Sequence, residues 1–377
     1  MGRERLPFVK VRWQGQDVSG SVLAVEVEDD DRLADKAELV YESRVACAAF
    51  REGQELSIEL GWEGDSAVLF HGVIVRLKAE ATPNGRERAT VTALDLSTRM
   101  HREAKTFSFE AGKVSEVVQT IVAAYGLELG RVECEPDTEL TPLKPLRQTN
   151  QTDLAFLQDV ARRYGARAFV EVNDGKPKFY FLPERVLLAA PVAGRMKYCG
   201  GSGELIEFAY RRAAMEAPPV TEATTVDAKS AKPATAKPAA PPPPEPITVD
   251  DGLLAALTKR DPAGAAAYST AVETAAQAAE TPEAQVRTQA AVGVPSDPAQ
   301  AELAARGDLT RGQGMTGEGV AVGTIELRAK SRVDLFGIAP WAEGAWYIRR
   351  AKHVYQNTST ESGGPSGTYK TTFVATR

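Results

Sequence analysis

Residues 148–165 read QTNQTDLAFLQDVARRYG, and this stretch decides the fold of the middle of the chain. Its apolar residues recur every three or four positions from Leu154 onward, which predicts an amphipathic helix. Asn150 or Thr152 can cap the first turn, because a short side-chain oxygen accepts a free backbone amide. Gly165 predicts the end of the helix, since glycine enters the left-handed conformation without steric cost.

The next segment predicts a β-hairpin, with strands over 166–172 and 178–182 around the Asn-Asp-Gly turn at 173–175. A second amphipathic helix is predicted over 114–125. Both helices close on an alanine, a tyrosine and a glycine, which suggests two copies of one helix-then-strand unit. We therefore expect residues 104–195 to form a small α+β domain.

The first hundred residues predict a β domain. Leu56, Ile58 and Leu60 alternate with polar residues, which is typical of a strand with one buried and one solvated face. Strands are expected at 8–13, 18–27, 37–41, 56–60, 68–77 and 89–94, with turns at 14–15, 61–65 and 83–85 and an acidic turn at 29–31. Short strands with frequent turns indicate a barrel or a sandwich, so we expect residues 1–103 to form a first β-barrel domain.

Residues 196–216 and 296–377 are expected to form a second β-barrel domain that is discontinuous in the chain. In its first part, Leu205, Phe208 and Tyr210 are the expected buried positions. Strand-like stretches in its second part are 323–330, 346–355 and 368–376, and a short helix is expected at 298–306. We expect the two parts to pair with each other across the intervening residues.

Between these parts, residues 217–295 form a long insertion of unusual composition. Nine prolines and eight alanines occupy the thirty positions 217–246, so this part buries too little apolar area to offset its ordering entropy. Residues 250–292 are rich in alanine and predict helices of marginal stability. The fold class is therefore α+β and mainly β: two barrel domains, a small α+β insert, and a Pro/Ala-rich insertion that is disordered or partly helical.

The composition excludes several classes of protein. The hydrophobic fraction of 43% is ordinary for a globular chain, and the formal net charge of −6 argues against a dedicated nucleic-acid binder. Cys47, Cys134 and Cys199 stand far apart, which favours a reducing compartment over a disulfide framework or a zinc site. No apolar run resembles a signal peptide or a membrane span, so we expect a soluble protein made in the cytoplasm.

No residue stands out as catalytic, cofactor-binding or metal-binding. His71, His101 and His353 lack a neighbouring Asp, Ser or Cys at the spacing that a catalytic triad or a zinc motif requires, so structural roles are expected for all three. Any two of the 51 carboxylates could in principle form a glycosidase pair, but most are expected to be solvated. We therefore predict no enzyme, no cofactor and no metal.

Two further patterns have ordinary explanations. Residues 312–319, GQGMTGEG, lack the Lys-Ser/Thr ending and the preceding strand of a phosphate-binding loop, so a flexible turn is expected there. The arginine pairs at 162–163, 211–212 and 349–350 are too small and too dispersed for a nucleic-acid surface.

Several blocks taken together resemble one family, the late control D proteins, which are baseplate hub proteins of contractile phage tails and of related injection systems. The helix-to-strand block at 148–171 resembles the family's Thr-Asp-x-x-Phe-Leu segment. The other blocks are REGQELSIELGW at 51–62, VLFHGVIVRLKAE at 68–80, ATVTALDLSTRMHR at 89–102, EGAWYIRRAKHVYQ at 343–356 and TYKTTFVATR at 368–377. The resemblance covers residues 6–215 and 296–377, and the insertion departs from it.

The resemblance implies a structural protein with two barrels similar to the tail-tube subunit. Three chains would form a homotrimeric ring that adapts a sixfold tail tube to a threefold spike. The implied partners are the tail tube protein, a separate spike protein, and possible tape measure and baseplate wedge proteins, in a particle assembled in the bacterial host cytoplasm. The alternatives are a hub-associated cell-wall hydrolase and an adaptor for a spike or cargo of an injection system.

Overall fold

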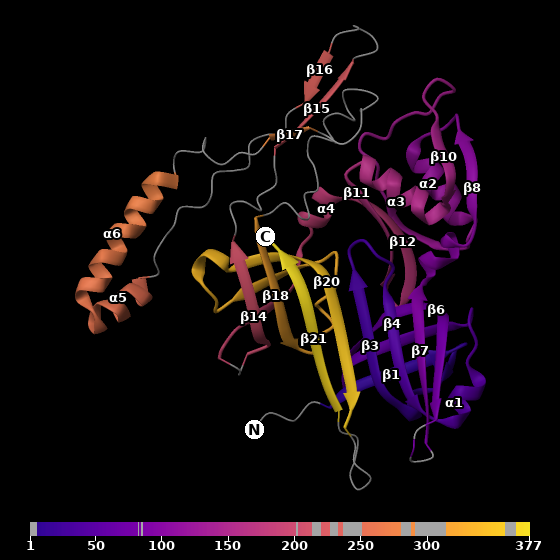
Figure 1. The fold of residues 1–377 in the computed structure, drawn as a ribbon, viewed down its shortest axis with the longest axis horizontal. Helices are drawn as coiled ribbons and strands as arrows, with labels where there is room; N and C mark the ends of the chain where they lie inside the picture. Colours follow the sequence, from indigo (N-terminus) through magenta and orange to yellow (C-terminus); the bar gives the residue numbers. More distant parts are fainter. Residues whose placement is uncertain are drawn as a thin grey trace.

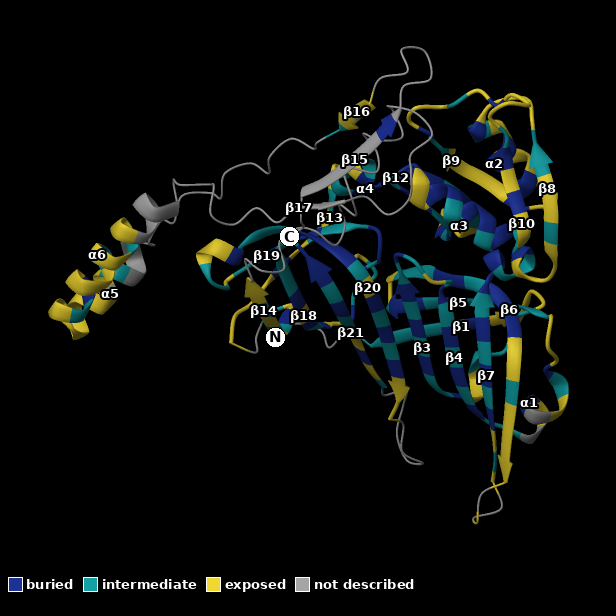
Figure 2. Cartoon of the chain, turned by 45° about the horizontal axis from the view of Figure 1, so that its top comes forward, coloured by how far each residue is buried: buried dark blue, intermediate teal, exposed yellow. Residues whose placement is uncertain are grey.

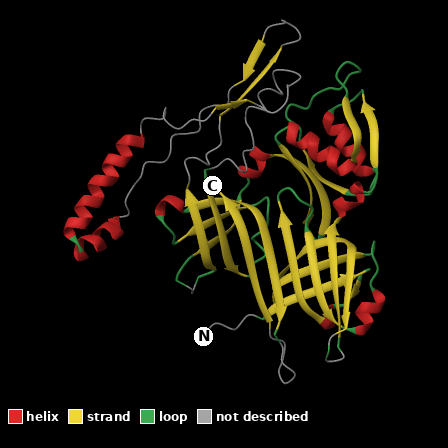
Figure 3. Ribbon diagram, viewed as in Figure 1, coloured by secondary structure: helices red, strands yellow, loops and turns green. Residues whose placement is uncertain are grey.

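The computed structural model consists mainly of β-strands, with a smaller helical part packed beside one end of the sheet (Figure 1). The structure describes residues 6–377 apart from 82, 84–85, 201–202, 213–219, 227–232, 237–250, 280–287, 291–313 and 359–366. One large sheet contains thirteen strands and extends through both β domains (Figure 3). The expected α+β, mainly β class is therefore correct.

The first barrel is a curled antiparallel sheet with the strand order β3-β4-β7-β6-β5-β1. Its strands are β1 (Pro7–Trp13), β3 (Val22–Asp30), β4 (Lys36–Glu42), β5 (Glu55–Trp62), β6 (Asp65–Ala81) and β7 (Glu87–Asp95), and the short β2 (Gln16–Asp17) pairs with β1. Leu56, Ile58 and Leu60 are fully buried, as their alternation predicts. Gln14 and Gly15 have φ of 47° and 80°, which confirms the expected tight turn.

Short helical elements join these strands. They are η1 (Ser19–Ser21), α1 (Arg44–Ala49) and η2 (Leu96–His101). The sequence pattern did not predict α1, because six residues are too few to show a helical period. Its start is nevertheless capped, since the Ser43 hydroxyl accepts the Ala46 N–H at 3.2 Å.

The α+β insert contains two longer helices, a hairpin and one short helix. Its elements are β8 (Ala104–Phe109), α2 (Val114–Ala123), β9 (Glu128–Val132), β10 (Leu146–Thr152), α3 (Asp153–Arg163), β11 (Ala166–Asn173), β12 (Lys176–Pro183) and α4 (Glu184–Leu188). The expected cap of α3 is Thr152, whose hydroxyl accepts the Ala155 N–H at 3.3 Å. Gly165 follows the helix with φ of 55°, and Asp174 and Gly175 form the hairpin turn with φ of 52° and 73°.

The order of elements agrees with the suggestion of two related units. Each helix follows one strand and precedes another, in the orders β8-α2-β9 and β10-α3-β11, and the leading strands β8 and β10 pair antiparallel. Gly126 after α2 has φ of 66°, close to that of Gly165 after α3. The two helices share one hydrophobic core, which also takes in Val73, Leu96 and Met100 from the first barrel.

The second barrel is assembled from two parts of the chain. Its strands are β13 (Val192–Lys197), β14 (Leu205–Arg212), β18 (Met315–Val322), β19 (Arg332–Phe336), β20 (Gly344–Asn357) and β21 (Gly367–Thr376), with the short η5 (Pro340–Ala342) before β20. β13 pairs parallel with β19, and β14 pairs antiparallel with β18, so the expected pairing across the insertion is present. Leu205 is fully buried, and Phe208 and Tyr210 are partly buried against the same core.

One expected strand of this barrel is wrong in position. The strand expected at 323–330 instead occupies Met315–Val322, and residues 323–331 form a loop. The expected turn at 312–319 is therefore also wrong from 315 onward. Gly317 and Gly319 leave room for aromatic rings on the neighbouring strands, since a Cβ would lie 2.3 Å from the Phe208 ring and 2.5 Å from the Phe373 ring.

The two barrels are joined by backbone pairing. β20 pairs antiparallel with β3 of the first barrel, with its partners running from Arg350–Asp30 to Gln356–Ala24. β20 and β21 also contribute to both cores. Trp346 and Phe373 lie in the core of the second barrel, whereas Tyr355 lies in that of the first.

The insertion carries more structure than its composition predicts. β15 (Val220–Val226), β16 (Pro233–Ala236) and β17 (Thr288–Ala290) form a small three-stranded sheet, and the threonines of β15 favour the extended conformation. The helices expected in 250–292 are present as α5 (Asp251–Arg260) and α6 (Pro262–Ala279), and most of their described side chains are exposed (Figure 2). The helix expected at 298–306 lies outside the described residues. Within the described part of the chain, no helix has the length and apolar character needed to cross a membrane.

Candidate functional site

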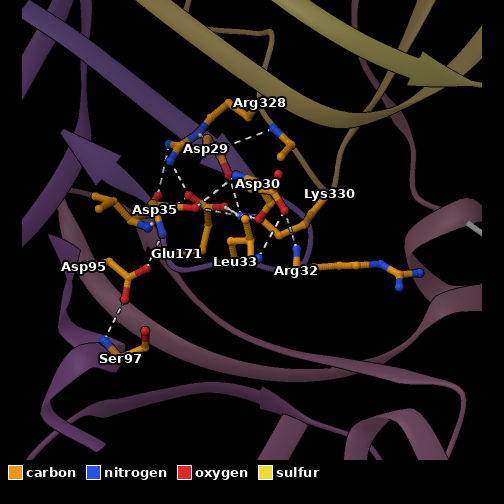
Figure 4. A network of polar contacts seen from close by, with 12 residues as sticks. Asp29, Asp30, Arg32, Leu33, Asp35, Asp95, Ser97, Glu171, Arg328 and Lys330 are labelled. Atoms are coloured by element: carbon orange, nitrogen blue, oxygen red, sulfur yellow. Dashed lines mark hydrogen bonds and ion pairs between the residues drawn. The ribbon is translucent and has the colours of Figure 1, made fainter. Parts of the chain in front are cut away.

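Buried and partly buried charged residues from four parts of the chain meet where the first barrel, the α+β insert and the second barrel touch (Figure 4). Four are acidic: Asp29 at the end of β3, Asp35 before β4, Asp95 at the end of β7, and Glu171 in β11. Two are basic, Arg328 and Lys330, and both lie in the loop between β18 and β19. We call these six residues the ionic junction.

Lys330 is the centre of the ionic junction. Its Nζ forms an ion pair with Asp29, and it lies 3.4 Å from the Asp35 carboxylate and 3.2 Å from the Glu171 carboxylate. It also donates a hydrogen bond of 3.0 Å to the Asp30 carbonyl. Only 3% of its side chain is exposed, so almost all of its charge is balanced by protein groups and not by water.

Arg328 connects three strands. Its guanidinium donates to the carbonyls of Val172 in β11 and Leu69 in β6, at 3.3 Å and 3.2 Å, and it forms an ion pair with Glu171. Its Nε lies 3.6 Å from Asp29 in β3. An arginine suits this position, because the planar N–H donors of a guanidinium can bind several acceptors at fixed angles. The loop of the second barrel is thereby fastened to the insert and to the first barrel.

The geometry of the acidic side chains also suits a cation. One oxygen from each of Asp29, Asp35 and Glu171 lies within 4.8 Å of the others, as metal ligands would. The Lys330 ammonium lies within ion-pair distance of all three. The protein itself therefore supplies the positive charge at this position, and the arrangement joins segments of the chain.

Burial separates the pKa values of the acidic groups. Burial, and then the charge of Asp29, raises the pKa of Asp35 well above its usual value. Burial acts in the same direction on Asp29, but Lys330 and Arg328 outweigh it and lower the pKa of that carboxyl. Burial also raises the pKa values of Asp95 and Glu171. With two cations and four carboxyl groups, a proton on Asp35 reduces the excess negative charge.

Asp95 links the ionic junction to the helical turn η2. Its carboxylate accepts the Asp35 N–H and the Ser97 N–H, each at 2.6 Å. The second of these bonds caps η2, from which Leu96 and Met100 enter the core of the insert. The same carboxylate therefore holds both the loop before β4 and the element that anchors the insert.

A second buried polar group joins the two helical units of the insert. Asp153, at the start of α3, accepts hydrogen bonds of 2.6 Å from Lys105 and from the Tyr125 hydroxyl, and one of 2.8 Å from Gln148. Burial alone would raise the pKa of Asp153, but these three donors together lower it. The bond from Tyr125 ties the end of α2 to the start of α3.

The three histidines have separate surroundings. His71 lies in β6 with Nε2 3.3 Å from Glu55, and His101 Nδ1 lies 3.3 Å from the Thr152 hydroxyl. His353 is buried in β20, where Nδ1 lies 2.9 Å from the Tyr369 hydroxyl and burial lowers its pKa to about 4.

The remaining residues singled out by sequence are spread over the molecule. Arg162 and Arg163 bind Asp159, Arg211 binds Thr316, and Arg350 binds Glu28. Cys134 is buried, which raises the pKa of its thiol to about 12, and Cys199 is exposed. We expected most carboxylates to be solvated, and this expectation did not identify the carboxylates of the ionic junction. Its members are up to 301 positions apart, so no local spacing could have revealed it.

Comparison with known proteins gives a clear result for the fold. The chain is similar to a tail protein from Neisseria meningitidis, with 12% identity, a TM-score of 0.61, and coverage of 98% of this chain and 96% of that one. It is also similar to the 43 kDa tail protein of prophage MuSo2 from Shewanella oneidensis, with 9% identity, a TM-score of 0.62, and 98% coverage of both chains.

A third similar structure comes from a secretion system. It is an Escherichia coli component of the type VI secretion system, described as structurally similar to the bacteriophage T4 tail proteins gp27 and gp5. Its identity to this chain is 11% and its TM-score is 0.58, with coverage of 97% of this chain and 76% of that one.

Comparison at the level of sequence adds little. A family model described as the Alg8 N-terminal domain matches residues 35–179, which is less than half of the chain and includes neither β20 nor β21. No curated protein sequence matches the chain. The similarities thus extend over nearly the whole chain at low sequence identity, and they show that this chain has the fold of phage tail and type VI secretion proteins.

Proposed function

We propose that the chain is a structural baseplate hub protein of the late control D family, which acts in a contractile phage tail or a related injection system. Three copies would form a ring, and the ring would adapt a sixfold tail tube to a threefold central spike. In this role the protein would act through side-chain packing and backbone pairing and would catalyse no reaction.

The observation that carries this proposal is the edge-to-edge joining of two barrels in one chain. β20 of the second barrel pairs with β3 of the first, so both barrels share one continuous sheet. Three such chains would place six barrels around an axis while keeping threefold symmetry. The fold shared with tail and secretion proteins over nearly the whole chain agrees with this role.

A ring of this kind needs a fixed angle between the two barrels. The ionic junction holds β3, β11 and the loop 323–331 together; Asp29, Asp35, Asp95 and Lys330 are buried, and Glu171 and Arg328 are partly buried. In some proteins buried ion pairs specify one arrangement even where they add little net stability. We therefore assign the ionic junction the task of fixing how the barrels and the insert are oriented.

The proposal includes the domain boundaries expected from sequence. The first tube-like barrel is residues 1–103, and the second is made of residues 196–216 together with 296–377. The α+β insert is residues 104–195, and the insertion is residues 217–295. The proposed partners are the tail tube protein on one side and a separate spike protein on the other, with tape measure and wedge proteins as further neighbours. The particle would be assembled in the cytoplasm of a bacterial host.

A second candidate is an adaptor for a spike or cargo. The observation that favours it is the helical hairpin α5–α6, which Figure 1 shows apart from the sheet and most of whose described side chains are exposed. Removal of the insertion separates the two candidates. A hub without it still forms a ring, whereas an adaptor loses its cargo.

The mass of the purified protein in solution tests the proposal, measured alone and with its tube and spike neighbours. A hub gives a particle of about three times the 40.5 kDa of one chain, either alone or once the spike protein is added. A monomer that binds neither neighbour would refute the ring. Lytic activity on peptidoglycan would instead favour the remaining alternative, a hub-associated hydrolase.

A further inference from the structure

We infer that residues 314–377 act as a clamp that closes the first barrel, so that this barrel is complete only when the last strands of the chain have docked on it. We call this segment the C-terminal clamp. Its described residues are 314–358 and 367–377. Docking of the clamp takes place within one chain, so it does not depend on whether three chains form the proposed ring.

The clamp pairs with the first barrel through backbone hydrogen bonds. β20 covers the outer edge of β3 over the whole stretch from Ala24 to Asp30. Without the clamp, β3 would present a row of unpaired backbone donors and acceptors at the edge of the sheet. Such an edge is prone to pair with other chains, so its cover is part of a stable fold.

The core of the first barrel also includes residues of the clamp. Tyr355 and Tyr369 of the clamp lie among its buried residues. The Tyr369 ring lies 5.8 Å from the Trp62 ring, and Trp62 Nε1 donates a hydrogen bond of 2.7 Å to the Gly323 carbonyl. The clamp therefore fills space in the first barrel and satisfies a polar group there.

The clamp and the first barrel also carry opposite charges at their contact. The clamp supplies both cations of the ionic junction, whereas the first barrel and the insert supply its four acidic groups. Without Arg328 and Lys330, the carboxylates of Asp29 and Glu171 would lie close together with no opposite charge between them. The surface that receives the clamp is thus complementary to it in shape, hydrogen bonding and charge.

The clamp is also far from the first barrel in the chain. Its lysine binds a carboxylate 301 positions earlier, and the insertion lies between the two segments. Chains are synthesised from the N-terminus, so β1 to β7 leave the ribosome long before β20 exists. A chain that ends before the clamp would therefore lack the strand that covers the edge of β3 and the tyrosines that complete the core of the first barrel.

A cleavable version of the full chain tests this inference. A protease recognition sequence is placed within residues 291–313, the folded protein is cut there, and the two pieces are followed by native mass spectrometry and hydrogen exchange during a urea titration. We expect the cut protein to remain one particle. As urea releases the clamp, amides of β3, β4 and β7 should lose their protection in the same step.

Two outcomes would overturn the inference. One is protection of β3, β4 and β7 at the level of the intact chain after the clamp has left. The other is departure of the clamp at once on cutting, without urea, since a clamp that closes the barrel must remain bound to it.

Variants at the contact surface make the test specific. In the cut protein, Asp29→Asn on the receiving side and Lys330→Met on the clamp side should each raise the dissociation constant of the clamp at least about tenfold. Glu80→Gln, at an exposed position of β6, is the matched control and should leave it unchanged. Trp62→Phe keeps the charges of Asp29 and Lys330 and removes only the hydrogen bond from Trp62 to Gly323. It should raise the dissociation constant of the clamp less, so it can be measured if the charge variants fail to fold. Equal affinities in all four variants would contradict the role of these contacts.

Discussion

Lys330 and Asp29 lie 301 positions apart in the chain and form an ion pair in which each side chain is only 3% exposed. Lys330 belongs to the loop between two strands of the second barrel, and Asp29 ends a strand of the first. The pair is therefore a direct bond between the two barrels. Since neither charge is solvated, the loss of either partner leaves the other buried without its nearest counter-ion.

Replacing Lys330 by Met should destabilise the protein strongly. The variant keeps the length of the side chain but removes the charge shared by Asp29, Asp35 and Glu171. The expected loss is about 3–5 kcal/mol in the free energy of unfolding, the range found when one partner of a buried pair is removed. Urea denaturation measures it. Lys370→Met, at an exposed position of β21, is the matched control and should change stability by less than about 0.5 kcal/mol.

Replacing Asp35 by Asn should be tolerated, in contrast to Asp29→Asn. Burial and the charge of Asp29 raise the pKa of Asp35, so its carboxyl is protonated in the folded state at pH values where the unfolded chain has lost the proton. Asn imitates the neutral acid, and its oxygen can still accept the Asp30 N–H that Asp35 accepts at 3.1 Å. We expect a loss below about 1 kcal/mol for Asp35→Asn.

The same pair of variants should differ in pH dependence. A raised carboxyl pKa stabilises the fold at low pH, and this contribution is lost as the pH rises through the folded pKa. Asp35→Asn has no carboxyl group to titrate, so its stability does not decrease in this way. Its free energy of unfolding should therefore rise relative to that of the unsubstituted protein, by up to about 1.4 kcal/mol per pH unit. Asp29 has a lowered pKa, so the penalty of Asp29→Asn should be full near pH 7 and shrink in acid. Denaturation from pH 2 to 8 compares them, because the contribution of Asp29 is lost only below the unfolded carboxyl pKa of 3.8, and parallel curves would contradict the assignment of the proton.

The sequence could predict the parts of this fold that depend on neighbouring residues. The helix α3 follows from an apolar period, a Thr cap and a Gly stop, and the hairpin after it follows from an Asn-Asp-Gly turn. The sequence predicts a strand at 323–330, but these residues lie in the loop 323–331. Its true conformation depends on Lys330, which has φ of 64° and points into a site built from distant carboxylates.

The ionic junction itself could not be predicted for the same reason. A charged residue in a strand is normally solvated, and nothing local distinguishes Glu171 or Asp29 from the acidic residues that remain on the surface. Only the packing of three segments makes them neighbours. That the two parts of the second barrel pair with each other was predictable, because a β domain interrupted by a Pro/Ala-rich stretch must close across it, whereas the strand β18 that pairs with β14 was not predicted.

Replacing Asp153 by Asn should loosen the insert. The carboxylate is 6% exposed and accepts hydrogen bonds from Lys105, Tyr125 and Gln148, which lower its pKa despite burial. A lowered carboxyl pKa gives stability that is present above the unfolded pKa and lost in acid. We expect a loss of about 1–3 kcal/mol near neutral pH that diminishes toward pH 3. Asp159→Asn, whose partners on the same helix are exposed, is the control, and an equal effect of the two changes would contradict the prediction.

Replacing Gly317 by Ala should strain the second barrel. A Cβ at this position would lie 2.3 Å from Cζ of Phe208, a ring that stacks on Phe373 at 5.7 Å. The aromatic ring must then move, at a cost of about 1–3 kcal/mol. Thermal unfolding measures the loss. Gly20→Ala is the control, because a Cβ there meets no atom within 4 Å, and this change should leave the midpoint nearly unaltered.

Deleting residues 213–314, which include the insertion, should leave both barrels intact. Arg212 at the end of β14 and Met315 at the start of β18 are direct partners in an antiparallel pair, so a tight turn can connect them. We expect a chain in which residues 213–314 are replaced by a short Asn-Gly turn to keep its free energy of unfolding within about 1 kcal/mol, because a long loop contributes little to closure. A matched chain in which the insertion is replaced by a Gly/Ser linker of equal length separates the effect of length from that of sequence. If both chains form the same particle in solution as the full protein, the insertion serves a partner outside the ring. If the short chain alone fails to fold, the barrel needs a longer connection between β14 and β18 but not the residues of the insertion. If both chains fail to fold, the insertion supports the second barrel directly, and the reading of 217–295 as a separable part is wrong.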